Sequence, residues 1–143
     1  PSYGFALNVF GGFLTESGKL DEADATLIEA GTIFSKYLSP TNLWIGDNLR
    51  NQAISLELQG KYDLSIEKAD AAARMYLENF GKHYDNYPTV LIAKGLSLAN
   101  SGRAKEAEPL LTEALELRTS SLPPSHSCLH RSVTNISKSP FWI

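Results

Sequence analysis

Three residues near the C-terminus carry side chains that commonly do chemistry in proteins. His126, Cys128 and His130 lie close together, and imidazole and thiolate groups are zinc ligands. On a helix His126 and His130 would share a face, being four positions apart, while Cys128 would point elsewhere. No second ligand pair and no nearby carboxylate completes a site. We therefore predict no metal and no cofactor, with a zinc or thiol site as the alternative to a plain polar capping helix.

The remaining reactive side chains show no catalytic pattern. His83 lies in a predicted loop, where exposure to solvent is its simplest state. No strand leads into a glycine-rich phosphate loop, and no nucleophile has a base at a recognisable spacing. We predict that the protein has no catalytic residues and is not an enzyme.

Composition and charge exclude several partners. The 143 residues include 13 basic and 16 acidic side chains, a net charge of −3, without the basic stripe that nucleic acid binding needs. No apolar run reaches the ~20 residues of a membrane-spanning helix. Cys128 is the single cysteine, so no internal disulfide can form, which fits a reducing compartment. We expect a cytoplasmic protein that binds neither nucleic acid nor membrane.

Three glycines mark the organisation of the chain. Gly18, Gly60 and Gly102 are spaced 42 residues apart, and each lies between two apolar stripes of helical period. A glycine just past a helix end adopts the left-handed conformation without steric cost. The spacing predicts three helix pairs, each made of an A helix, a glycine turn and a longer B helix.

The predicted pairs occupy residues of about 3–40, 43–82 and 87–123, followed by a capping helix at about 125–137 and a tail at 138–143. In the first A helix the apolar residues with helical spacing predict the packed stripe. These residues are Leu7, Phe10, Gly11 and Leu14.

The breaks between pairs contain helix signals. Thr41 or Asn42 can cap the second A helix, and Asp85 or Asn86 the third, because their side chains accept a backbone N–H. Pro109 should bend the third B helix unless it lies in the first turn, where a missing N–H has no consequence.

Alignment of the three glycines superposes small residues where two helices must approach closely. They are Gly11, Ala53 and Gly95, then Ala23, Ser65 and Ala107, then Ala30, Ala72 and Ala114. This pattern resembles the tetratricopeptide repeat. The 42-residue period and the Glu-Ala-Glu-Pro-Leu segment at 106–110 resemble its kinesin-light-chain-like subfamily, whose asparagine pair is only partly kept here. The resemblance implies an all-α, right-handed superhelical stack of antiparallel helix pairs that forms a single domain over residues 1–143.

In such a stack the A helices form a concave wall that binds peptides or proteins. Residues that flank the packed stripe should line this groove, where polar ones can hydrogen-bond a peptide and apolar ones offer a contact patch. The predicted groove residues are Asn8, Asp47, Arg50, Asn51, Ile54, Thr89, Ile92, Leu96 and Asn100, with Gly12 beside them. Contact of Ile92 and Leu96 with the neighbouring repeat alone is the open alternative. The carboxylate clamp of chaperone-binding members is matched only at Asn51, so the resemblance implies no clamp.

We predict a non-enzymatic scaffold that binds a protein or peptide partner in the groove. The alternative is a regulatory or self-associating segment of a larger signalling protein, such as a kinase or a transcriptional regulator. An abrupt start at Pro1 and an apolar tail at Phe141, Trp142 and Ile143 favour this alternative, which would make the protein a homo-oligomer or a piece of a longer chain.

Overall fold

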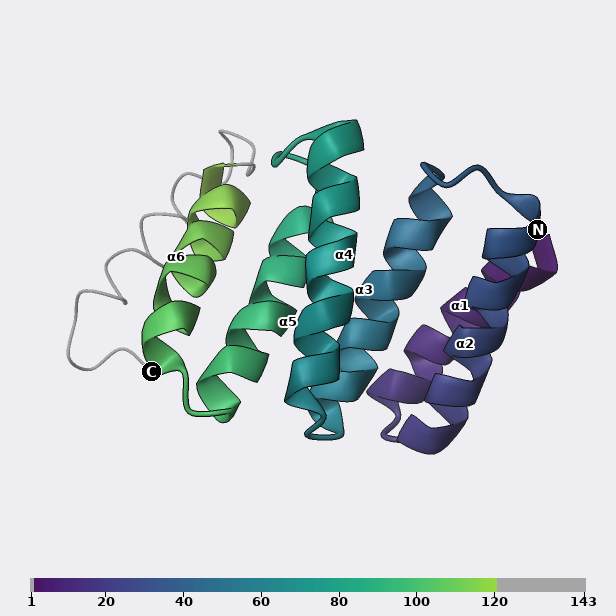
Figure 1. Cartoon of the computed structure of the whole chain (residues 1–143), viewed down its shortest axis with the longest axis horizontal. Coiled ribbons are helices and arrows are strands. Elements are labelled where there is room, and N and C mark those ends of the chain that lie inside the picture. The colour runs from purple at the N-terminus through teal and green to yellow at the C-terminus, as the bar shows by residue number, and fades with distance from the viewer. Residues whose placement is uncertain (1, 121–143) are drawn as a thin grey trace.

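The computed structural model describes residues 2–120, which form six α-helices and no strand. The helices are α1 (Ser2–Glu16), α2 (Leu20–Tyr37), α3 (Leu43–Leu58), α4 (Tyr62–Phe80), α5 (Tyr87–Asn100) and α6 (Ala104–Ser120). They follow one another in chain order along the long axis of the molecule (Figure 1). The predicted all-α helical-repeat fold is confirmed. The predicted capping helix at 125–137, the tail at 138–143 and the His126–Cys128–His130 cluster lie outside the described residues.

The helices associate as the antiparallel pairs α1–α2, α3–α4 and α5–α6 (Figure 1). Helix α3 also contacts α1 and α5, so the three odd-numbered helices form one continuous row. Each even-numbered helix contacts the next odd-numbered one, α2 with α3 and α4 with α5. The first helix of each pair therefore supplies the wall on which the predicted groove residues lie.

The turn inside each pair is the same glycine motif. Gly18, Gly60 and Gly102 have φ angles of 82°, 81° and 89°, the left-handed region predicted for them. Each glycine N–H donates to the carbonyl three residues back, and the following N–H donates to the carbonyl five residues back. These bonds define the Schellman ending, which satisfies the last carbonyls of a helix. The next residue, Lys19 or Lys61 in the first two pairs, is already the N-cap of the following helix.

Small residues lie where the two helices of a pair approach each other. A methyl group added to Gly11 would stand 2.5 Å from Leu27 Cδ2, and one added to Gly95 would stand 2.7 Å from Leu111 Cδ2. Both distances are well inside van der Waals contact. In the middle pair Ala53 is fully buried, so the small residue there is alanine. The predicted close approaches at these positions are confirmed.

The prediction of a packed stripe on α1 is wrong for one residue. Gly11 and Leu14 are buried as predicted, but Phe10 is 50% exposed. Its ring lies against that of Phe13, with centroids 6.4 Å apart, at the open end of the stack. Helical period alone could not separate the side of α1 that meets α2 from the side that no described helix covers.

The cap predictions have different outcomes. Asn42 caps α3, since its Oδ1 accepts the N–H of Trp44 at 2.9 Å. Asn86 occupies the N-cap position of α5 but makes no side-chain cap bond; its amide donates to Asp47 instead, at 3.2 Å.

Pro109 is the sixth residue of α6, beyond the first turn, so the carbonyl four residues earlier loses its usual N–H donor.

Candidate peptide-binding groove

A hollow of about 400 Å³ lies between α1 and α3. It is lined by Phe5, Asn8, Val9, Gly12, Phe13 and Glu16 of α1 and by Asp47, Arg50 and Asn51 of α3. The three α3 residues and Asn8 belong to the predicted groove set, so the structure brings them together. A smaller hollow of about 70 Å³ shares Gly12 and Asn51 with the first and also contains Ile54. We call the two hollows together the α1–α3 groove.

Asn8 forms part of the floor of the groove. It is only 5% exposed, because it joins α1 to α3. Its Oδ1 accepts from Asn48 Nδ2 at 3.1 Å and from Asn51 Nδ2 at 3.3 Å, and its main-chain carbonyl accepts from Asn51 at 3.4 Å. All three bonds use oxygen atoms of Asn8. The side chain therefore couples the groove to the junction between the first two helix pairs.

Arg50 is held in place by its neighbours on α3. Its Nε and Nη2 donate to Asn51 Oδ1 at 3.3 and 3.0 Å, and its Nη1 lies 3.7 Å from Asp47 Oδ1. Both charged side chains are 20% exposed. The guanidinium is oriented before any ligand arrives, which lowers the entropy that binding would cost.

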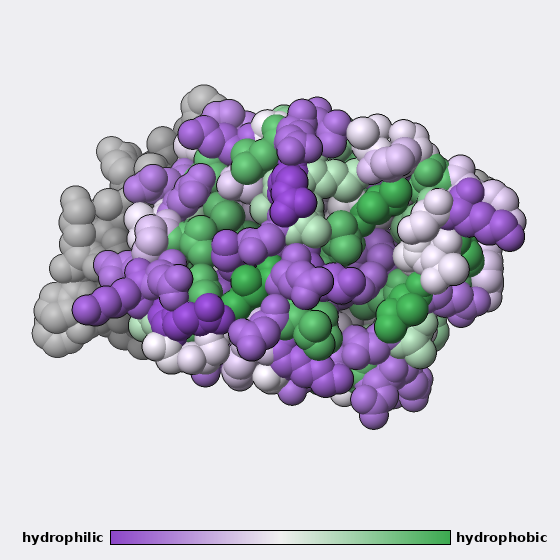
Figure 2. Space-filling model, in the orientation of Figure 1, coloured by the Kyte–Doolittle hydropathy of each residue, from purple (hydrophilic) through white to green (hydrophobic). Residues whose placement is uncertain are grey.

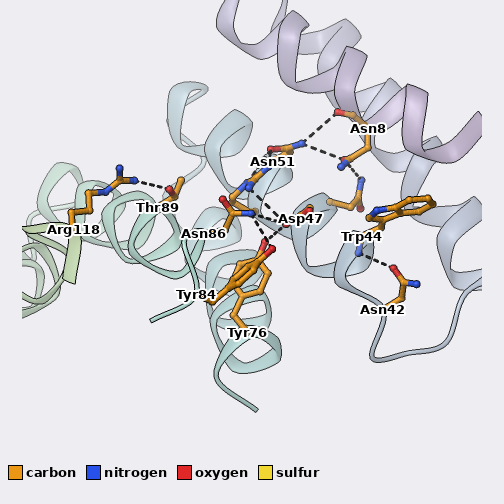
Figure 3. A network of polar contacts seen from close by, with 12 residues as sticks. Asn8, Asn42, Trp44, Asp47, Asn51, Tyr76, Tyr84, Asn86, Thr89 and Arg118 are labelled. Atoms are coloured by element: carbon orange, nitrogen blue, oxygen red, sulfur yellow. Dashed lines mark hydrogen bonds and ion pairs between the residues drawn. The ribbon is translucent and has the colours of Figure 1, made fainter. Parts of the chain in front are cut away.

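Asp47 connects α3 to α4 and to the segment before α5 (Figure 3). Its Oδ1 accepts from the Tyr76 hydroxyl at 2.6 Å and from Asn86 Nδ2 at 3.2 Å. Tyr84 lies beside them, with its ring 5.0 Å from that of Tyr76 and its hydroxyl 3.4 Å from Asn86. The groove edge is thus tied to the core through one carboxylate oxygen.

The same surroundings disfavour ionisation of both tyrosines. Burial is the main reason that the pKa of Tyr76 lies far above its ordinary value, and the hydrogen bond to Asp47 adds to it. Burial also raises the pKa of Tyr84, helped by the negative charge of Asp47. Both phenols stay neutral, so Tyr76 remains a donor to Asp47. Sequence reasoning missed these partners, since Tyr76 and Asn86 are 29 and 39 residues from Asp47 and no local spacing signals such contacts.

The predicted groove residues of α5 continue the row beyond this hollow. Thr89 accepts a hydrogen bond from Arg118 Nη2 at 2.7 Å (Figure 3). Ile92 is half-buried and packs against the main core cluster. Leu96 is 40% exposed, and Asn100 is exposed. None of the four lines the α1–α3 groove.

Three apolar residues of the groove were not predicted. Phe5, Val9 and Phe13 line it and are 43%, 57% and 61% exposed. They follow one another at intervals of four residues, which is a second helical stripe beside the one used for packing. The four-residue spacing is the signal in the sequence from which these groove residues could have been predicted.

The described part of the chain offers little for metal or membrane chemistry. No group of three or more His, Cys, Asp or Glu residues within 2–120 could hold a metal ion. None of the helices in this range is long and apolar enough to cross a membrane.

The stacked antiparallel helix pairs and their glycine turns define a helical-repeat protein. Residues 45–120 match the family described as tetratricopeptide repeat, which is more than half of the chain. The chain therefore belongs to the tetratricopeptide repeat family.

The chain is also similar to individual proteins. The intraflagellar transport protein 80 homologs of Rattus norvegicus and Mus musculus are 32% and 30% identical over 82 residues. The match covers 57% of this chain and 10% of those proteins, so the chain spans about a tenth of their length. A crystal structure of a TPR-like protein from Chlorobium tepidum superposes with a TM-score of 0.74 at 17% identity, covering 94% of this chain and 91% of that one, which supports the fold.

Proposed function

We propose that the protein is a non-enzymatic scaffold module that binds a peptide or protein segment in the α1–α3 groove. The observation that carries the proposal is a hollow in which apolar side chains of α1 face a fixed polar row on α3. Membership of the tetratricopeptide repeat family supports it, because proteins of this family generally serve as interaction scaffolds.

The groove chemistry favours a ligand with an apolar anchor. Phe5, Val9 and Phe13 offer exposed surface for that anchor, and apolar contact supplies most of the affinity in such sites. Asn51 and Arg50 lie where they can hydrogen-bond a peptide backbone.

The charges of the groove argue against a terminal carboxylate as the ligand. Glu16 and Asp47 are acidic, and the charge of Arg50 is already offset by Asp47 at 3.7 Å. A ligand carboxylate would meet a net negative groove. The peptide is therefore neutral or basic beside its apolar anchor.

We further propose that the chain belongs to the kinesin-light-chain-like subfamily with a 42-residue period, as one domain with repeats at 3–40, 43–82 and 87–123. The three Schellman turns at this interval support the period. The extension of the groove to Thr89, Ile92, Leu96 and Asn100 remains a prediction, and so does the cytoplasmic location.

A second candidate is a module inside a larger assembly protein. It is favoured by the match to the intraflagellar transport protein 80 homologs, in which the similar segment is a tenth of the length. On this alternative the isolated chain would bind no short peptide, and its partner would be another part of the parent protein.

Gly12 allows a sharp test of the groove. A methyl group there would lie 3.6 Å from Asn51 Nδ2, an ordinary contact, so Gly12→Ala is accommodated. Gly12→Trp would instead fill the hollow without removing any of its hydrogen bonds. Neither change alters the Asn8, Arg50 or Asp47 side chains.

The measurement is fluorescence anisotropy with a peptide selected from a random library on the full chain. Gly12→Trp should weaken binding by at least about tenfold, while Gly12→Ala binds as the unmodified chain does. A double change of Arg50 and Asn51 to alanine should also weaken it. Full affinity of the folded Gly12→Trp variant would overturn the groove assignment.

A further inference from the structure

A hollow of about 430 Å³ lies on the side of α3 that faces away from the α1–α3 groove. It is lined by residues of α2, α3 and α4, and we call it the α2–α4 hollow. Its residues on α3 are Ile45, Asn48, Leu49 and Gln52. With 3.6 residues per turn, these four lie on the opposite side of the helix from Asp47, Arg50 and Asn51. Figure 2 shows hydrophobic residues interspersed with hydrophilic ones over this part of the surface, where α3 passes between α2 and α4.

The second junction closes the corresponding space with an ion pair. Ile28 of α2 and Gln52 of α3 both line the hollow. The residues 42 positions after them are Asp70 and Lys94, whose charged groups lie 2.6 Å apart and join α4 to α5. The space that this pair bridges at the second junction stays open at the first.

Two further positions of the hollow differ from their counterparts one period later. Gly31 has no side chain, whereas its counterpart Ala73 packs against the main core cluster. Lys68 of α4 corresponds to Leu110 of α6, which packs against the same cluster. The repeat fold therefore does not impose the hollow. It results from the residue types that the first junction has at these positions.

The lining offers apolar surface and hydrogen-bonding groups with capacity to spare. Ile28 is 60% exposed. Gln52 Nε2 donates to Asn48 Oδ1 at 2.6 Å, which leaves the Gln52 carbonyl oxygen for a ligand N–H. The Thr32 hydroxyl donates to the Ile28 carbonyl at 3.0 Å, and its oxygen can still accept. A peptide segment satisfies such a surface with an apolar side chain and its main-chain amides, and the volume falls within the ~300–1,000 Å³ of ligand sites.

Lys68 sets the charge of the hollow. It is half-buried, and it is the one charged residue among those that line the hollow. Within residues 2–120 no acidic side chain pairs with it. A half-buried ammonium group attracts a carboxylate more strongly than a fully solvated one does. The hollow therefore favours an acidic ligand, whereas Glu16 and Asp47 give the α1–α3 groove the opposite preference.

We propose that the α2–α4 hollow binds an acidic segment of a partner protein. An apolar side chain of the segment occupies the hollow, and a neighbouring carboxylate pairs with Lys68. This site is separate from the α1–α3 groove and does not depend on it. Because the two lie on opposite sides of α3, the chain can hold two segments at once.

The probe for this site is a peptide selected from a random library on the Gly12→Trp chain, in which the α1–α3 groove is filled. Selected peptides should carry Asp or Glu next to a large apolar residue. Ser35 lines the hollow, is exposed, and its side chain makes no hydrogen bond that a substitution would remove. By fluorescence anisotropy, Ser35→Trp should weaken binding by at least about tenfold. Ser35→Ala is the matched control and should bind as the unmodified chain does.

A second pair of variants tests the charge. Lys68→Glu should weaken binding by roughly tenfold, because it replaces an attraction by a repulsion. Arg74→Glu makes the same charge change on α4 outside the hollow and should have little effect. Added salt should weaken binding to the unmodified chain, since an ion pair contributes to it.

A double variant copies the closed junction into the open one. Ile28→Asp with Gln52→Lys reproduces the pair formed by Asp70 and Lys94 and should also weaken binding. It serves in place of Ser35→Trp if circular dichroism shows that variant to be unfolded, and Gly12→Phe likewise replaces Gly12→Trp.

The proposal fails if the library yields no binder or if the folded Ser35→Trp chain binds at full affinity. It also fails if Lys68→Glu and Arg74→Glu have equal effects, or if the peptide that binds the α1–α3 groove competes for this site. Since selection uses a chain with that groove filled, a failure here leaves the groove proposal standing, and the reverse also holds.

Discussion

The two junctions between helix pairs are built in different ways. Where the first pair meets α3, polar side chains do much of the joining: Asn48 and Asn51 bond to Asn8, and Ser55 and Gln59 bond to Asp24. A hollow of about 430 Å³ also lies between α2 and α3.

Where the second pair meets the third, a buried apolar cluster does most of the joining. Tyr87, Val90 and Leu91 of α5 share it with Ala72 and other residues of α3, α4 and α6. The Lys94–Asp70 ion pair and the Ser97–Ser65 hydrogen bond lie at the same junction. The contrast indicates that buried apolar surface stabilises the second junction, whereas hydrogen bonds fix the geometry of the first, beside the contacts of the Trp44 ring with those of Phe5 and Phe34.

The largest expected effect comes from the apolar junction. Leu91 is 4% exposed within the cluster, and removal of a buried leucine side chain leaves a cavity. Leu91→Ala should lower the free energy of unfolding by about 2–5 kcal/mol, measured by urea denaturation followed by circular dichroism. The exposed Leu115→Ala is the control, and an equally small loss in both variants would contradict the contrast between the junctions.

A smaller and more local effect is expected at the polar junction. Asn48 is 3% exposed, donates to Leu27 and Asn8, and accepts from Gln52. Asn48→Ala should cost about 1–3 kcal/mol, because it leaves a buried carbonyl without its donor.

Hydrogen exchange would show where that loss falls. In Asn48→Ala the amides of α1 and α2 should exchange faster while those of α5 and α6 keep their protection, because the altered junction opens separately. Gln52→Ala, which removes only the bond to Asn48, should have a smaller effect. Uniform acceleration across all helices would show that the junctions do not differ in this way.

The contrast also shows what the sequence could reveal. Helices and turns were predictable because their signals are local: a helix was expected on each side of Gly18, Gly60 and Gly102, as observed, and the three turn glycines adopt the expected conformation. These features depend on hydrogen bonds between residues three to five apart.

The groove was only partly predictable for the opposite reason. Asn8, Asp47, Arg50 and Asn51 follow from the side of the helix on which they lie, and they line one hollow. The role of Asn86 does not follow from the sequence. Its side chain was expected to cap α5, but its amide instead donates to the carboxylate of Asp47, 39 residues away. Such a choice depends on how the pairs stack, which short-range pattern does not specify.

The smallest expected effect concerns Tyr76, where the groove meets the apolar cluster. Its ring is fully buried in that cluster while its hydroxyl donates to Asp47 at 2.6 Å. Tyr76→Phe keeps the ring and removes the hydrogen bond, so at neutral pH the free energy of unfolding should fall by about 1 kcal/mol.

The pH dependence of that difference tests its cause. In the folded chain burial holds the pKa of Tyr76 far above its ordinary value of about 10. Below pH 10 the phenol is neutral in both folded and unfolded chains, and the stabilising bond is fully present. As the pH rises above 10, only the unfolded chain loses the proton, so the unmodified protein loses stability that Tyr76→Phe does not.

The advantage of the unmodified chain should therefore shrink above pH 10 in urea denaturation, with the raised pKa values of Tyr84 and Tyr87 common to both proteins. A difference that stayed constant from pH 7 to pH 11 would mean that Tyr76 ionises as readily folded as unfolded, and that the groove edge is not anchored to the core through this hydroxyl.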